Sequence, residues 1–380
     1  MWPNKRLINL FDIELPIIQA PMAGSAFSDM VVAVSEAGGL GSLACAVLSV
    51  EQARRELETI RRKTSRPINV NFFCHQQPPS DPAREMNWRR RLEAYYVEIE
   101  LDHNATVLSS DRAPFDDKMC DLVLEFHPEV VSFHFGLPDR NLLARVRRTG
   151  AKVISSATSV DEARWLEDQG CDAIVAQGYE AGGHRGMFLT PDVSTQVGTM
   201  ALVPQVVDAV KVPVIAAGGI ADARGVVAAF ALGAVAVQIG TAYLHCPEAQ
   251  ISPIYRQALK DAKDNETVIT NVFTGRPARG IVNRLMREVG PMSDLAPEFP
   301  LAAAAVAPLR AKSEMAGSAD FTPLWAGQAA RLNRELPAAE LTKQLAAETL
   351  EKLRILQATA SPDVLAQSAA LATVGRPVAR

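Results

Sequence analysis

Residues 213–220 read PVIAAGGI, and residues 236–241 read AVQIGT. Each run is a short apolar segment that leads into glycine, which is typical of a buried strand followed by a tight turn. Between them, Ala221–Leu232 carries apolar residues at spacings of three and four, as does a helix that covers a sheet. The two runs and the segment between them therefore predict a βαβ unit with parallel strands.

The same alternation of short apolar runs and helical segments extends toward the amino terminus. Eight candidate strands lie near Ile17–Ala20, Gly41–Leu43, Ile68–Phe73, Val130–Phe135, Lys152–Ser156, Ala173–Gln177, Val214–Ala217 and Ala236–Ile239. Eight βα units close into a (β/α)8 barrel, the TIM barrel, an α/β fold of roughly 250 residues. Because the chain has 380 residues, we expect one barrel with a smaller, mostly helical lid.

Two segments interrupt this rhythm and set the expected domain boundaries. Residues 78–114 are polar and resemble an insertion after the third strand, at the end of the barrel where active sites lie. Residues 246–320 lack the alternating strand and helix pattern of the barrel and contain glycine and proline residues that interrupt regular structure. We therefore expect a lid or substrate domain there. The barrel then comprises residues 1–245 and 321–360, and residues 361–380, which carry no strong pattern, are expected to form a mobile tail.

The composition argues against several classes of partner. With 22% charged residues and a net charge of -4, the chain has no basic stripe for nucleic acid and no polybasic anchor for a membrane. It also lacks an apolar run long enough to span a bilayer. The five cysteines are scattered and never spaced as C-x-x-C, which argues against a disulfide framework and against a metal site. With no secretory signal at the amino terminus, the expected location is the reducing cytoplasm.

The loops after the last two predicted strands indicate a phosphate site. In a TIM barrel these loops commonly bind phosphate, because glycine lets backbone N–H groups come close to the anion. Gly218 and Gly219 alone are equally compatible with a plain tight turn. A second loop one βα unit later favours phosphate, and its residues are Gln238, Ile239, Gly240 and Thr241.

A glycine-rich loop follows the sixth predicted strand. It contains Gly182 among three glycines within five residues, which suggests that its backbone approaches a ligand. Strand parity lets Gln177 end the strand with its side chain toward the barrel mouth. His184 is the candidate titrating group, as an acid, a base or a partner for an anion. A lone loop histidine is more often a surface residue, but these glycines favour a functional one.

Three further strand ends converge on the same mouth. Asn69 and Asn71 share a face of the third strand, and a carboxamide offers both a donor and an acceptor. Ser132 and His134 share a face of the fourth strand, so both point inward or both point outward. Met22 follows the first strand and either lies against a planar ring or fills the core.

Taken together, these motifs resemble the class I nitronate monooxygenases, formerly called 2-nitropropane dioxygenases. The matching runs are QAPMAG at residues 19–24, NVNFF at 69–73, SFHFG at 132–136, EAGGHRG at 180–186 and PLWAGQ at 323–328, together with the two phosphate loops. The resemblance covers most of the chain up to about Ala330. Many FMN barrels share the phosphate loops, whereas the SFHFG and EAGGHRG runs are more specific to this family.

The resemblance implies an FMN cofactor that lies across the barrel mouth. Its phosphate would lie at Gly182, Gly219 and Gln238–Thr241. The residues facing the flavin ring would be Met22, Asn71, Gln177 and Gln328. The substrate side would be lined by Ser132, His134 and His184, and His184 would hold the anion or act as a base.

The resemblance also implies the reaction. Family members oxidise anionic alkyl nitronates, notably propionate 3-nitronate, with oxygen to a carbonyl product and nitrite. Electrons pass singly from nitronate to flavin, giving a flavosemiquinone, and no nicotinamide is required. A nitronate is already a carbanion equivalent, so a site with few ionisable groups suffices. The aromatic residues that shape the substrate cavity are not assigned, and Phe321 stands where a tyrosine would be unsurprising.

Other functions remain open at this stage. The nearest is an NAD(P)H-dependent FMN reductase acting on quinones or enoyl thioesters, since nicotinamide binds such barrels without a local motif. A relative of the IMP dehydrogenases would need a cysteine in the loop after the sixth strand, and none is present. A non-catalytic flavin-binding barrel is the third option, because fold alone does not establish activity. The oligomer is expected to be a monomer or a homodimer.

Overall fold

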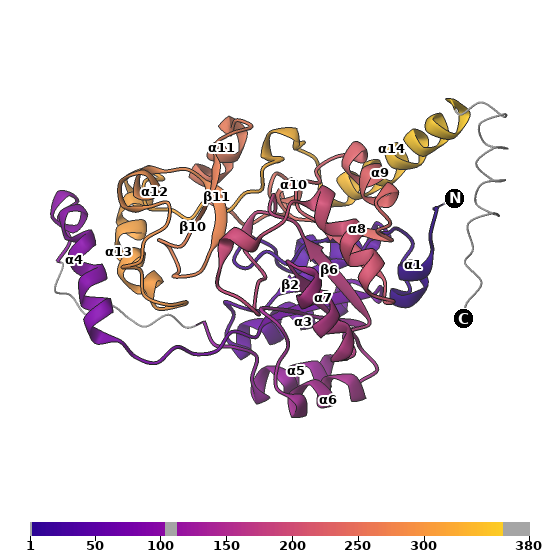
Figure 1. Ribbon diagram of the computed structural model, residues 1–380, viewed down its shortest axis with the longest axis horizontal. Helices are drawn as coiled ribbons and strands as arrows, with labels where there is room; N and C mark the ends of the chain where they lie inside the picture. The colour runs from indigo at the N-terminus through magenta and orange to yellow at the C-terminus, as the bar shows by residue number, and fades with distance from the viewer. Residues whose placement is uncertain (1, 103–111, 360–380) are drawn as a thin grey trace.

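The computed structural model describes residues 2–102 and 112–359 (Figure 1). Its main sheet has eight parallel strands in the order β1-β9-β8-β6-β5-β4-β3-β2. They are β1 (Ile17–Gln19), β2 (Gly41–Ala44), β3 (Ile68–Phe73), β4 (Val130–His134), β5 (Lys152–Ala157), β6 (Ala173–Gln177), β8 (Val214–Ala217) and β9 (Ala236–Ile239). A parallel bridge between Ile18 and Leu40 brings the two edges of the sheet together. The predicted TIM barrel is confirmed, and every predicted strand matches an observed one to within one residue at each end.

Helices surround this barrel. They are α2 (Ser28–Glu36), α3 (Val50–Lys63), α5 (Asp117–Phe126), α6 (Arg140–Arg148), α7 (Val160–Asp168), α8 (Thr199–Ala209), α9 (Ala223–Ala231) and α14 (Ala338–Thr359). Local sequence explains several of their starts: Ser49 and Gln52 form a capping box at α3, and Asp222 caps α9 through its carboxylate. Helix α14 packs against α9 and α2, so residues near the end of the described chain complete the ring of helices.

The amino-terminal end of the barrel is closed by helix α1 (Arg6–Phe11). Its side chains Leu7 and Phe11 are buried in a cluster with Ile18, Val130 and Ile215 from the barrel strands. Because apolar side chains fill this end, we expect the ligand site at the opposite end, where the carboxyl termini of the strands lie.

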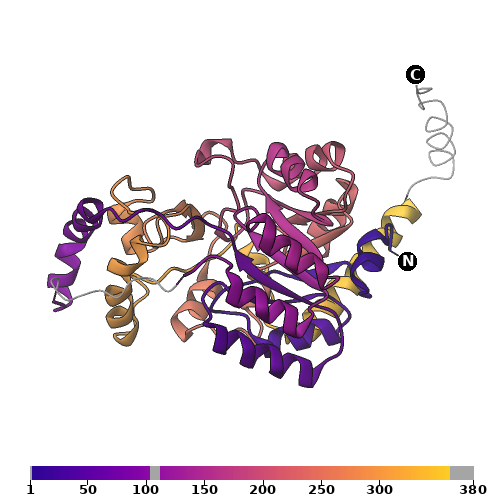
Figure 2. The same ribbon diagram turned by 90° about the horizontal axis from the view of Figure 1, so that it is seen from below.

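A second group of elements lies to one side of the barrel (Figures 1 and 2). It contains α4 (Pro82–Glu98), α12 (Arg284–Val289) and α13 (Ala302–Met315), and between it and the barrel lie α11 (Pro253–Asp261) and a small antiparallel sheet. The order of this sheet is β10 (Thr267–Thr270), β11 (Ala278–Ile281), β7 (Gly183–His184). The shortest helices are α10 (Thr241–Leu244), η1 (Val193–Thr195) and η2 (Ala330–Leu332).

Helix α4 packs against α13 although more than 200 residues separate their contacting positions. The indole N–H of Trp88 donates to the carbonyl of Ala302 at 3.2 Å, and the hydroxyl of Tyr96 donates to the carbonyl of Ala305 at 2.6 Å. These side chains share a hydrophobic cluster with α12 that is separate from the barrel core. We propose that this cluster is the core of the lid, and the boundaries given above for barrel and lid also stay a proposal.

Two parts of the expected domain plan lie outside the described residues: the tail at 361–380 and the section 103–111 of the insertion. Among the described residues, no helix combines the length and the apolar character that crossing a membrane requires.

Candidate active site

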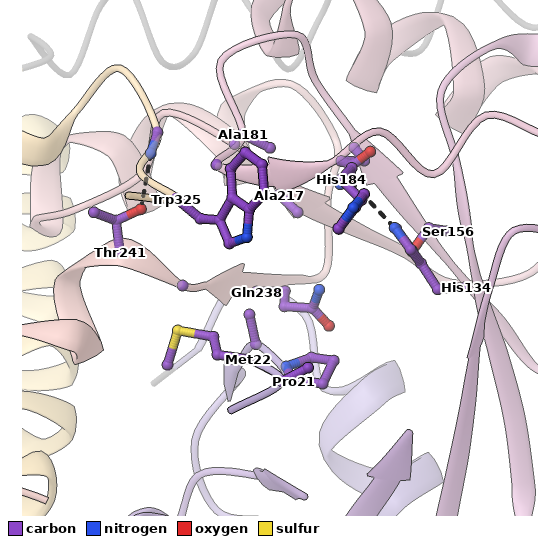
Figure 3. Close-up of a pocket in the computed structure, with 18 of the residues that line it drawn as sticks. Pro21, Met22, His134, Ser156, Ala181, His184, Ala217, Gln238, Thr241 and Trp325 are labelled. Atoms are coloured by element: carbon purple, nitrogen blue, oxygen red, sulfur yellow. Dashed lines mark hydrogen bonds between the residues drawn. The ribbon is translucent and has the colours of Figure 1, made fainter. Parts of the chain in front are cut away.

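A cavity opens at the carboxyl ends of the barrel strands, and most of the predicted site residues line it (Figure 3). Its volume is about 1390 Å³ when the open space at its mouth is included. The predicted residues that line it are Met22, Asn71, Ser132, His134, Gln177, Gly182, His184, Gly218, Gly219, Gln238, Gly240 and Thr241. Ser132 and His134 therefore point inward, which decides the alternative left open by strand parity.

Two predicted site residues do not line the cavity. Ile239 is buried in the barrel core, and the side chain of Gln328 is exposed while its backbone N–H donates to the carbonyl of Glu180 at 3.0 Å. The parts assigned to them in cofactor binding stay predictions. Asn69 also lies outside the cavity, because it is fully buried and donates to the hydroxyl of Ser42 at 3.0 Å.

Glycines in the loops after β6 and β8 form a cradle with little room for side chains. A Cβ at Gly182 would lie 2.5 Å from the backbone nitrogen of Gly327, and one at Gly218 would lie 3.0 Å from that of Ala181. Gly218 and Gly219 have φ angles of 108° and 70°, which side chains rarely adopt. The backbone can therefore come close to a ligand at this end of the cavity.

The cradle also offers hydrogen-bond donors. Within residues 2–102 and 112–359, no acceptor pairs with the backbone N–H groups of Gly219, Gly240 and Thr241. The hydroxyl oxygen of Thr241 accepts from the N–H of Gly327 at 3.0 Å, which leaves its O–H available as a further donor. A backbone cradle with free N–H groups suits a phosphate, so the residues present fit the phosphate end of FMN.

Glu180 and Thr199 hold two of these loops together, and sequence reasoning did not single them out. The Glu180 carboxylate accepts from both the N–H and the hydroxyl of Thr199 at 2.8 Å, while that hydroxyl also lies 2.9 Å from the carbonyl of Gly218. In the sequence, only the presence of an acidic residue inside a glycine-rich loop could have pointed to Glu180. The Glu180 carboxylate positions the cradle and does not line the cavity.

At the other end of the cavity, short strand β7 carries His184. Gly183 and His184 pair with Arg279 and Ala278 of β11, which fixes the loop after β6 against the small sheet. Gln177 holds it from the barrel side: its Nε2 donates to the carbonyl of His184 at 3.0 Å, and its Oε1 accepts from the N–H of Gly186 at 2.7 Å. Gln177 thus lines the cavity with both ends of its amide already bonded to the loop.

His134 supports the same loop. Its Nε2 lies 3.2 Å from the carbonyl of His184 and its Nδ1 lies 3.0 Å from the hydroxyl of Ser156 (Figure 3). Because a carbonyl only accepts, Nε2 carries the proton of the neutral ring, and Nδ1 accepts from Ser156. Burial lowers the pKa of His134 to about 3, so the ring is uncharged at neutral pH.

His184 is also held neutral. Its pKa lies well below the ordinary value, first because the ring is buried and then because Arg112, His134, Arg276 and His75 would repel a positive charge. Its Nε2 is 2.9 Å from the hydroxyl of Thr274, and its Nδ1 has no partner among the described residues. An uncharged imidazole with one free nitrogen can exchange a hydrogen bond with a substrate.

Charge in the cavity comes from one side chain that sequence reasoning missed. Among the described residues that line it, Arg112 is the only one with a full charge, and no aspartate or glutamate is present. Arg112 lies near the end of the insertion after β3 and belongs to no motif, so nothing local in the sequence identified it. The cavity therefore has a positive potential that favours anions.

The aromatic lining, unassigned from the sequence, comes from Phe73, Phe133, Tyr255 and Trp325. The Trp325 ring lies 5.4 Å from that of His184, and the hydroxyl of Tyr255 donates to the Trp325 carbonyl. Phe321 lies elsewhere, buried in the cluster around α4 with its ring 5.3 Å from that of Tyr95.

Comparison with known proteins gives a consistent picture. Residues 4–348 match the family model described as nitronate monooxygenase. A nitronate monooxygenase of Pseudomonas aeruginosa is 41% identical over 345 residues, which cover 90% of this chain and 98% of the relative. Among solved structures, a nitroalkane oxidase from Streptomyces ansochromogenes is 39% identical with a TM-score of 0.83, over 92% of this chain and 99% of that one. FabK from Thermotoga maritima is more distant, at 29% identity and a TM-score of 0.71, over 93% and 98% of the two chains.

Proposed function

Because the chain belongs to the nitronate monooxygenase family, we propose that it uses FMN and oxygen to convert alkyl nitronates of the propionate 3-nitronate type into a carbonyl product and nitrite. Membership makes the protein an oxidoreductase with a small-molecule substrate. The observation that carries the proposal is the charge of the cavity, whose described lining holds one arginine and no carboxylate. A nitronate arrives already deprotonated, so the site must attract and position an anion and needs no strong base.

We assign the cofactor phosphate to the glycine cradle, at Gly182, Gly219, Gly240 and Thr241. The support for this is the close backbone approach and the free N–H groups at that end of the cavity. Residues along the remaining wall would border the flavin ring, and these are Met22, Asn71 and Gln177. When bound, FMN supplies the electron acceptor for the nitronate and the reaction with oxygen.

His184 is assigned to the substrate side as the group that holds the nitronate. A neutral imidazole can donate a hydrogen bond to a nitronate oxygen without transferring its proton. His134 acts as a positioning residue, since its Nε2–H is directed at the carbonyl of His184. Because the lowered pKa makes His184 a weak base, we expect a nitronate to react much faster than its neutral nitroalkane.

The test is a steady-state assay of the purified holoenzyme. Oxygen consumption and nitrite release are measured with propionate 3-nitronate, with 3-nitropropionate, whose nitro-bearing carbon is still protonated, and with NADH or NADPH plus a quinone. The proposal predicts nitrite release with the nitronate and no turnover of either nicotinamide. Turnover of a nicotinamide without any nitronate oxidation would instead identify the reductase left open by the sequence.

A further inference from the structure

Arg112 lies where the main cavity meets a second hollow. It lines the cavity described above, and it also lines an outer hollow together with Tyr255, Arg310 and Trp325. The backbone carbonyl of Arg112 accepts from the Nε2 of His75 at 3.2 Å, which ties this part of the chain to the end of β3. A substrate entering from the outer hollow would pass this guanidinium on its way to His184.

The guanidinium of Arg112 has no counter-ion in the part of the chain that the structure describes. No hydrogen bond or ion pair joins it to a carboxylate there, and its Nη1 is buried without a hydrogen-bond partner. Burial, followed by repulsion from Arg310, lowers the pKa of Arg112. A partly buried, unpaired cation is destabilising unless a ligand satisfies it, so this arrangement favours an anionic ligand.

The position of Arg112 indicates which anion it meets. The Phe299 ring lies 5.8 Å from the Arg112 guanidinium carbon and 5.3 Å from the His184 ring, so Arg112 belongs to the histidine end of the cavity. The glycine cradle, by contrast, is built from the loops after β6, β8 and β9. A cofactor phosphate in that cradle leaves Arg112 free for the substrate.

Arg310 differs from Arg112 in having a partner. Its Nε lies 2.8 Å from the carboxylate of Glu314, and its side chain is about half exposed. Its charge is therefore partly neutralised and screened by solvent. It adds to the positive potential of the outer hollow but is a poorer anchor than Arg112.

We propose that Arg112 is a specificity-determining residue that binds a carboxylate at the end of the substrate remote from the nitronate group. This inference rests on the proposed function and adds a second contact point to it. His184 holds the nitronate, while Arg112 pairs with a carboxylate tail that extends toward the outer hollow. A guanidinium suits this task because its planar fork matches the two carboxylate oxygens.

The test compares two nitronates that differ in the tail. Propionate 3-nitronate carries a carboxylate, and butyl 1-nitronate carries an uncharged alkyl chain. The substitution Arg112→Met should lower kcat/KM for the carboxylated substrate by about 10- to 100-fold, mainly through KM, as expected for losing one charged hydrogen-bonded pair. For butyl nitronate the change should stay below about threefold, because that substrate makes no ionic contact with Arg112.

Two further variants control for charge and for folding. Arg354→Met removes the same charge from an exposed position on α14 and should leave both substrates unaffected. Arg112→Lys keeps the charge but loses the planar fork of the guanidinium. Its kcat/KM for the carboxylated substrate should therefore lie between those of the wild type and Arg112→Met, while its kcat/KM for butyl nitronate should stay unchanged. If Arg112→Met does not fold, the lysine variant still decides the question.

Equal losses for both nitronates would contradict the inference, because Arg112 would then hold the nitronate group or the cavity wall. A wild-type enzyme without preference for the carboxylated nitronate would contradict it as well. A second readout separates this inference from the proposed function: succinate is titrated into the holoenzyme and its binding is followed through the flavin spectrum. Binding of succinate that weakens at least about tenfold in Arg112→Met supports the carboxylate site even if no nitronate is oxidised.

Discussion

His184 is a buried, uncharged ring with one nitrogen free, and the proposed reaction depends on that state. Its packing against Phe299 and Trp325 fixes the ring, while the nearby arginines oppose its protonation. The substitution His184→Phe keeps an aromatic ring of similar shape and removes the N–H. We expect kcat/KM for propionate 3-nitronate to fall by about 10- to 100-fold, the cost of one hydrogen bond to a charged group.

The control for this prediction is His184→Asn, which retains a side-chain N–H and should recover part of the activity. Each preparation is normalised to its flavin content, so that loss of cofactor is separated from loss of substrate binding. Unchanged kcat/KM in His184→Phe would remove this residue from the substrate site.

The histidine cluster also makes stability depend on pH. Burial lowers the pKa of His75 from 6.5 to about 4 and that of His134 from 6.5 to about 3. Below pH 6.5 the unfolded chain takes up protons that the folded chain does not, so the free energy of unfolding decreases as the pH falls toward 4. Each of these histidines contributes a slope of at most about 1.4 kcal/mol per pH unit in that range.

Urea unfolding between pH 7.5 and pH 4.5 measures this slope. The variant His75→Gln removes one titrating group. Its free energy of unfolding should therefore fall less steeply than that of the wild type below pH 6.5, and the two should run nearly parallel above that pH. An identical slope in the variant would mean that His75 titrates normally in the folded protein.

At the scale of elements, the cradle depends on glycine at the ends of β6 and β8. Gly219 combines a φ of 70° with a Cβ position only 3.2 Å from the side chain of Glu180. Gly219→Ala should therefore displace the loop and weaken FMN binding by at least about tenfold, through strain and lost N–H contacts of about 1 to 3 kcal/mol.

Gly150→Ala is the matched control, because Gly150 has a φ of 87°, nothing within 4 Å of its Cβ position and no contact with the cavity. Gly150→Ala should lower stability through the same backbone strain but leave FMN affinity unchanged. The FMN affinity of both variants is measured by flavin fluorescence on titration of the apoprotein. Equal FMN affinities in Gly219→Ala and the wild type would show that the cofactor phosphate does not bind at Gly219.

The contact of α4 with α13 allows a test of the proposed lid. Trp88 is buried between them, so Trp88→Ala should destabilise this cluster by about 3 to 5 kcal/mol. Met86 lies on the same helix with its side chain 57% exposed, and Met86→Ala should change stability by less than about 0.5 kcal/mol.

Hydrogen exchange reads out the effect element by element. If the cluster is a separate unit, Trp88→Ala accelerates exchange in α4, α12 and α13 together while the barrel strands keep their protection. Uniform acceleration across the barrel would show instead that lid and barrel unfold as one unit.

For the whole molecule, the barrel was predictable because each of its strands is a short, largely buried run with glycine or proline near at least one end. The run from Ile68 to Phe73 and the run from Ala236 to Ile239 were both located without error. Spacing within motifs also placed Asn71, His134 and Gly219 at the cavity, since carboxyl ends of parallel strands meet at one rim.

Contacts between distant segments were not predictable. Strand β7 has two residues and pairs with β11 almost 100 residues later, so no periodicity reveals it. The segment that forms α4 was predicted as part of an insertion, and its packing on α13 leaves no trace in either segment alone. Arg112 could not be predicted for the same reason. Its importance depends on having no carboxylate partner among the described residues of the folded chain, and the local sequence does not reveal this.

The central claim is that a nitronate, and no nicotinamide, reduces the bound cofactor in this cavity. The most direct measurement is the absorbance spectrum of the purified holoenzyme during anaerobic mixing with propionate 3-nitronate and, separately, with NADH and NADPH. We predict that the nitronate changes the flavin spectrum and that neither nicotinamide does. Bleaching by NADH or NADPH alone, with no response to the nitronate, would contradict the claim and identify the protein as a reductase.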